Sequence, residues 1–86
     1  MQNATEIVNT FTPAILGKCK FPLIVVYHNP SDFPGKYVAR LWDADNPTKY
    51  AVIADSLTVI HSTIPENMNC LARTKQDDPC IQETWF

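Results

Sequence analysis

A histidine and two aspartates in the first two thirds of the chain have side chains of the types that perform general acid–base chemistry. They are His28, Asp32 and Asp55. Imidazole and carboxylate groups transfer protons near neutral pH when they converge on one substrate atom. These three fall at a predicted strand end, in a loop and at a helix cap, so their spacing does not bring them together. Asp32 has the local role of a turn former and Asp55 that of a cap. We therefore expect no catalytic residues and a protein that is not an enzyme.

The three cysteines are the next candidates for chemistry, as nucleophiles or metal ligands. Cys19, Cys70 and Cys80 are widely spaced and form no CxxC pair. A cysteine nucleophile needs a nearby cation or helix start that lowers the thiol pKa, and Cys70 and Cys80 fall on or beside predicted strands. His61 is expected on the apolar stripe of a helix, away from any paired ligand spacing. The pattern predicts reduced thiols in a cytosol, no metal site and no cofactor.

Charge and composition exclude further classes of function. The net charge is −2 and the basic residues are scattered, so a nucleic-acid partner is not expected. Gly17 and Gly35 stand alone, and no glycine-rich phosphate loop is present. The first residues are polar and the longest apolar run is far too short to cross a bilayer. We expect a cytoplasmic protein that does not bind membranes.

The elements that must position these residues begin with three apolar, β-rich segments. Asn-Pro, Pro-Gly and a second Asn-Pro lie in the connections between them. Segments of this kind predict an antiparallel meander over residues 21–28, 36–43 and 48–54. In the second, Ala39 and Leu41 share one face, and Val38, Arg40 and Trp42 share the other.

Two helical patterns flank the meander. Apolar residues at helical spacing predict a short helix over 4–12, which Pro13 interrupts. A second short turn could follow it, with Thr12 as its cap and Gly17 ending it in the left-handed conformation.

After the meander, Asp55 or Ser56 is expected to cap a helix that Pro65 stops. Its apolar stripe has the spacing i, i+3, i+4, i+7 and consists of Leu57, Ile60, His61 and Ile64. Short strands over 68–73 and 80–86 complete the expected elements.

The order α-β-β-β-α-β-β predicts an α+β fold with a mostly antiparallel sheet and one helix packed across a face. Residues 1–86 are expected to form one domain, with a helical segment over 1–17 and a core over 21–86.

The second sheet face is then partly bare unless the N-terminal helix or another copy of the chain covers it. We assign Trp42 and Trp85 to that face, with Arg40 beside Trp42 and Phe33 at a loop tip. These four residues are the predicted partner contacts. The last strand is expected at a sheet edge, where it could pair with a second copy in a homodimer.

Two resemblances bear on function. The run from His28 to Trp42, and the run Asp77-Asp-Pro-Cys-Ile-Gln-Glu-Thr-Trp85, resemble small uncharacterised proteins of phages and mobile elements in Gram-positive and gut bacteria. Such accessory proteins often bind and inhibit host or defence proteins, anti-CRISPR proteins among them. The resemblance therefore implies a small interaction module with a host or defence protein as its partner.

Residues 23–72, in the order β-β-β-α-β, are similar to HicB-type antitoxins. That similarity implies an alternative role as an antitoxin or sequestering protein that binds a small toxin. A second alternative is a sponge for a small ligand or nucleotide at a dimer interface.

Overall fold

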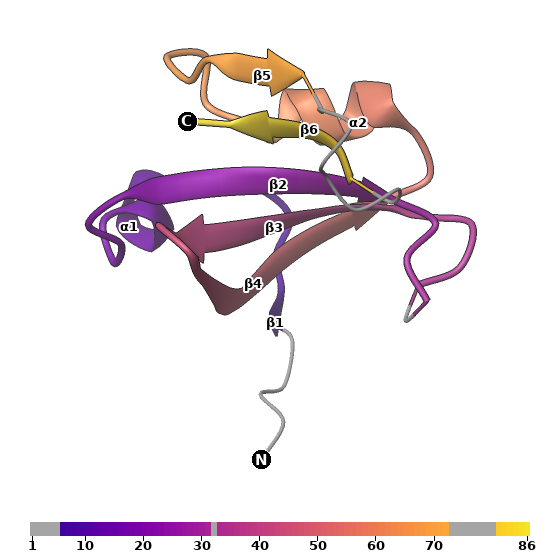
Figure 1. Cartoon of the computed structure of the whole chain (residues 1–86), viewed down its shortest axis with the longest axis horizontal. Coiled ribbons are helices and arrows are strands. Elements are labelled where there is room, and N and C mark those ends of the chain that lie inside the picture. The colour runs from indigo at the N-terminus through magenta and orange to yellow at the C-terminus, as the bar shows by residue number, and fades with distance from the viewer. Residues whose placement is uncertain (1–5, 32, 73–80) are drawn as a thin grey trace.

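In the part of the chain that the structure describes, a six-stranded sheet and two short helices form the fold (Figure 1). A computed structural model describes residues 6–31, 33–72 and 81–86. The elements in chain order are β1 (Glu6–Ile7), α1 (Pro13–Leu16), β2 (Pro22–His28), β3 (Tyr37–Asp43), β4 (Asn46–Ala54), α2 (Leu57–Ser62), β5 (Cys70–Ala72) and β6 (Ile81–Trp85). The strands lie in the order β1-β4-β3-β2-β6-β5, and only β1 and β4 pair in parallel. The predicted α+β class with a mostly antiparallel sheet is confirmed.

The meander of β2, β3 and β4 is the part that the sequence predicts best. Its register places Ile24 beside Leu41, and Val26 beside Ala39, which in turn lies beside Val52. The β2–β3 loop closes where the Asn29 Oδ1 atom accepts a hydrogen bond from the Gly35 amide at 2.7 Å. Both residues have positive φ, which asparagine and glycine tolerate best. The turn chemistry of the sequence therefore determines this hairpin locally.

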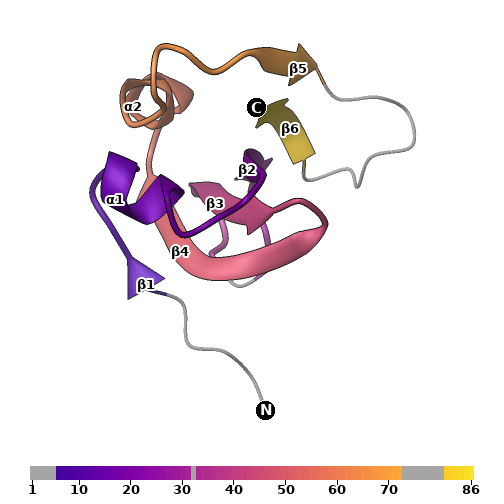
Figure 2. The same cartoon turned by 90° about the vertical axis from the view of Figure 1, so that its left-hand side faces the viewer.

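One face of the sheet, which we call the covered face, carries the core. Figure 2 shows both helices on the same side of the sheet. The core consists of strand residues that alternate onto this side together with buried residues from the segments that pack over them: Phe11, Ile24, Val26, Ala39, Leu41, Val52, Ile60 and Ile64. The predicted apolar stripe of α2 is confirmed in part: Ile60 is buried and Leu57 half-buried, but His61 is exposed, and the helix ends at Ser62, so the buried Ile64 lies beyond it. The Ser56 hydroxyl, rather than Asp55, caps that helix by accepting from the Val59 amide.

The N-terminal prediction is wrong. Residues 6 and 7 of the expected 4–12 helix form β1, where Glu6 pairs with Tyr50 and Ile7 with Ala51. The Val8 amide continues this pairing by donating to the Ala51 carbonyl at 2.9 Å. A helix of this length is only marginally stable by itself. The hydrogen bonds that residues 6–8 form with the edge of β4 therefore favour the strand over the helix.

The second short turn forms as α1. The Thr12 side chain caps it, as expected, but Gly17 ends it with φ −66°, in the right-handed rather than the left-handed region. The backbone angles at position 17 therefore do not require a glycine.

The last strand is not a sheet edge, which corrects a second expectation. β6 pairs with β2 on one side and with β5 on the other, both antiparallel. The three-residue β5 is the outer strand instead. An edge-to-edge homodimer on this side of the sheet would have to use β5.

Candidate functional site

The predicted acid–base residues do not converge. The His28 ring stacks on Tyr37 with centroids 4.2 Å apart, and the Asp55 carboxylate forms an ion pair with Lys36. Asp32 lies outside the described residues. Within the described part of the chain, no three His, Cys, Asp or Glu side chains are arranged to hold a metal ion.

The thiols are in surroundings that disfavour the reactive thiolate. Burial and then the Asp43 carboxylate raise the pKa of Cys19. Burial, the charge of Glu83 and a hydrogen bond with Glu83 raise the pKa of Cys70. A nucleophilic cysteine needs the opposite shift, so these two thiols do not form a nucleophilic centre. Cys80 lies outside the described residues.

A polar cluster joins α2 to β6 on the covered face. The Glu83 Oε1 atom lies 2.5 Å from His61 Nε2 and accepts a hydrogen bond of 2.8 Å from Trp85 Nε1. The His61 ring also meets the Trp85 indole edge-on, with centroids 5.5 Å apart. The side chains of His61 and Trp85 thus each contact the Glu83 carboxylate through a ring nitrogen. Such a network is typical of a structural link between a helix and a sheet.

Trp85 is consequently on the opposite face from the one assigned to it. Its register partner on β2 is Ile24, a core residue, and it packs against the core. Glu83 lies on the same side, because it pairs with Val26.

Arg40 and Trp42 do share the other face, which we call the open face and define by Val25, Tyr27, Val38, Arg40 and Trp42. In the described part of the chain, no helix lies over it (Figure 2). The Arg40 guanidinium donates to the Thr48 carbonyl at 2.9 Å. Trp42 borders a shallow hollow of about 390 Å³, and its buried indole N–H has no acceptor among the described residues.

Phe33, the remaining predicted contact, is half-buried in the β2–β3 loop. Its amide donates to the Pro30 carbonyl, and its carbonyl accepts from the Lys36 amide. Phe33 is therefore part of the ordered turn, and it lies away from Trp85. The four predicted contacts do not form one surface.

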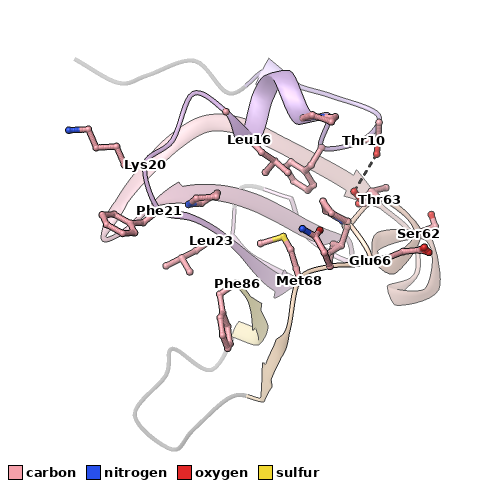
Figure 3. A pocket seen from close by; sticks show the side chains of 17 residues that line it. Thr10, Leu16, Lys20, Phe21, Leu23, Ser62, Thr63, Glu66, Met68 and Phe86 are labelled. Carbon is pink, nitrogen blue, oxygen red and sulfur yellow. Dashed lines mark hydrogen bonds between the residues drawn. The ribbon is translucent and has the colours of Figure 1, made fainter.

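A groove that the sequence did not predict lies at the end of the sheet where β2 begins and β6 ends (Figure 3). This end groove has a volume of about 880 Å³. Its walls come from α1, the start of β2, the segment between α2 and β5, and Phe86. Its lining is mainly apolar and includes Phe11, Leu16, Phe21, Leu23, Met68 and Phe86.

Two phenylalanines and two charged residues distinguish the end groove. Phe21 is 69% exposed and Phe86 51% exposed. Lys20 and Glu66 line the groove as well, and Figure 3 shows their side chains far apart, with the apolar residues between them. Neither charged side chain has an ion-pair partner among the described residues.

The groove was missed because its walls come from four segments that are separate in the sequence. The sequence pattern predicts that Phe21 is the first residue of one apolar strand and that Phe86 is the last residue of another. Only the β2–β6 pairing brings the two strand ends together. The structure places each phenylalanine just outside its strand, whereas the sequence pattern includes both in the predicted strands, so no local signal marked them.

Comparison of the chain with protein-family models, curated proteins and solved structures finds no match. The described residues also include no helix of the length and apolar character needed to cross a membrane. The functional argument therefore rests on the surfaces of this chain.

Proposed function

We propose that this protein is a small, non-enzymatic interaction module, borne by a phage or prophage, that binds and inhibits a host or defence protein through the end groove. The observation that carries the proposal is the pair of exposed phenylalanines at a mainly apolar groove of about 880 Å³. Large aromatic side chains at a concave apolar site are typical anchors of protein–protein interfaces. The separation of His28 from Asp55 and the raised thiol pKa values support a binding role over a catalytic one.

The test is capture of partners from a bacterial host lysate by the intact protein and by matched variants. We expect one stoichiometric host protein on the wild type and its loss on the double variant Phe21→Ser/Phe86→Ser. Val59→Ser is the matched control, because Val59 is 51% exposed and does not line the groove. Retention of the same partner by the double variant would exclude the groove as the contact surface.

The open face is the second contact candidate, and a further exposed residue tests it. Leu71 is 56% exposed and pairs with Thr84, which pairs with Val25 of the open face. If Leu71→Ser or Arg40→Ala releases the partner while the groove variant retains it, the predicted contacts Arg40 and Trp42 are favoured instead. Inhibition is then measured on the captured protein's own activity with each variant.

The antitoxin alternative is favoured by one observation. β2, β3, β4, α2 and β5 follow one another in the order expected of HicB-type antitoxins. It predicts that a small toxin encoded beside this reading frame binds the protein tightly and is neutralised on co-expression. A toxin that remains active on co-expression would exclude this role.

The ligand-sponge alternative is favoured by the hollow beside Trp42 on the open face. It predicts a higher thermal midpoint with cyclic or modified nucleotides, because a ligand that binds only the folded state stabilises it. An unchanged midpoint at millimolar nucleotide would exclude it.

A further inference from the structure

We infer that the occupant of the end groove is an amphipathic helix of the partner protein, with an acidic residue placed at Lys20, a basic residue at Glu66 and apolar residues between them. This inference rests on the proposed function and names the chemical class of the partner. Three features of the groove lead to it: the pairing of its backbone groups, the exposure of its two phenylalanines and its charges.

Several backbone groups on two sides of the groove are already paired within the chain. The Thr63 carbonyl accepts from the Thr10 hydroxyl at 3.3 Å and from the Phe11 amide at 3.4 Å. Asn69 and Phe86 exchange both backbone hydrogen bonds, at 2.7 and 2.9 Å.

The start of β2 is paired in the same way. The Phe21 carbonyl accepts from the Ala44 amide, and the Asp43 carboxylate accepts from the amides of Lys20 and Phe21. Three further lining residues are prolines, which have no N–H to donate: Pro13, Pro22 and Pro65.

An extended peptide binds by adding a strand, and for that it needs a row of free backbone donors and acceptors. The groove walls described above do not present such a row. A helix satisfies its own backbone hydrogen bonds and binds through side chains alone. The groove therefore suits a helix better than a strand.

The exposure of the groove points the same way. Pockets for small molecules enclose about 300–1,000 Å³ and bury most of the ligand. The end groove has a volume within that range, about 880 Å³, but its two phenylalanines are more than half exposed. An open apolar trough of this kind accepts several apolar side chains of one helix face, at the spacing i, i+3, i+4 and i+7.

The charges of the groove determine which flank of the helix is acidic and which is basic. The Lys20 ammonium and the Glu66 carboxylate lie apart and have no ion-pair partner among the described residues (Figure 3). A helix with an acid near Lys20 and a base near Glu66 complements both charges, and the reversed arrangement places like charges together. Complementary rim charges give specificity more than affinity.

The experiment is a display selection on the intact protein with two peptide libraries of equal length, each of about 20 residues, so that one library can form stable helices. One has Leu or Phe at i, i+3, i+4 and i+7 and is otherwise random in helix-forming residues. The other alternates apolar β-branched and random residues, which favours an extended strand.

We expect binders from the helical library, with an acid at one flank and a base at the other. Their affinity should fall about tenfold or more on Phe21→Ser/Phe86→Ser and stay unchanged on Val59→Ser. The charge-exchanged double variant Lys20→Glu/Glu66→Lys should select peptides with the two flanking charges exchanged. That exchange separates a docked helix from nonspecific apolar adsorption.

Binders from the extended library alone, no binders, or binders insensitive to Phe21→Ser/Phe86→Ser would overturn the inference. The lysate capture separates this failure from failure of the proposed function. If the native partner requires Phe21 and Phe86 but no helical peptide binds, the groove remains the contact surface and only the helical class of its occupant is wrong.

Discussion

The covered face and the open face use a tryptophan in opposite ways. On the covered face, the Trp85 indole N–H donates to Glu83, which also contacts His61 on α2. On the open face, the Trp42 indole N–H is buried and has no acceptor among the described residues. The Trp85 N–H is thus satisfied by a carboxylate of its own strand, β6, which His61 of α2 also contacts, whereas the Trp42 N–H has no such neighbour among the described residues. The difference teaches that α2 is joined to the covered face by a polar contact through His61 as well as by the buried side chain of Ile60.

The largest expected difference between the faces is in the cost of removing buried methyl groups. Leu41 is fully buried in the core of the covered face, and we expect Leu41→Ala to lower the free energy of unfolding by about 3 kcal/mol. Val38 on the open face is 3% exposed without a helix above it, and we expect Val38→Ala to cost only about 1 kcal/mol. Urea unfolding measures both. A loss for Val38→Ala as large as that for Leu41→Ala would mean that the open face is also tightly packed.

The two tryptophans give the next largest difference. Trp85→Phe removes the donor to Glu83, and we expect it to destabilise the fold by about 1 kcal/mol. Trp42→Phe removes a buried donor without an acceptor, so the relief offsets the lost ring area and we expect a change within about 0.5 kcal/mol. The same unfolding measurement compares them. The contrast between the faces fails if Trp42→Phe is the more damaging of the two.

The contact between His61 and Glu83 should contribute less than the hydrogen bond from Trp85 to Glu83. The His61 side chain is 43% exposed, and partly exposed ion pairs stabilise proteins only weakly. We expect a coupling free energy of about 0.5 kcal/mol from the double-mutant cycle His61→Ala and Glu83→Ala. A coupling of zero would show that α2 is attached by its apolar stripe alone.

The smallest expected effect is on thiol reactivity. The negative charge of Glu83 and its hydrogen bond help to raise the pKa of Cys70, so less thiolate is present at a given pH below that pKa. Glu83→Gln should lower the pKa and speed alkylation of Cys70 by iodoacetamide by about two- to fivefold near pH 8. Cys19 is the internal control, because its pKa is raised by burial and by Asp43.

Peptide mapping by mass spectrometry gives the alkylation rate at each cysteine. If both cysteines accelerate together in Glu83→Gln, the substitution has loosened the fold, and the electrostatic explanation for Cys70 is wrong.

The parts of this protein that follow from the sequence are those with local causes. Alternation in the second strand separated Ala39 and Leu41 from Val38, Arg40 and Trp42, and the register confirms that separation. Hydroxyl side chains cap both helices, at Thr12 and Ser56. A strand's two faces and a helix's first turn depend on neighbours within a few residues, which is why the sequence alone suffices for them.

What only the tertiary structure decided are the non-local pairings. Alternation groups Glu83 with Trp85 but does not say which face they join, and the β2–β6 register places them with the core. The same pairing brings Phe86 to the start of β2 and so makes the end groove, while pairing with β4 turned an expected helix into β1. Contacts between residues far apart in sequence depend on how buried surface and hydrogen bonds are shared over the whole chain, and no local pattern encodes that choice.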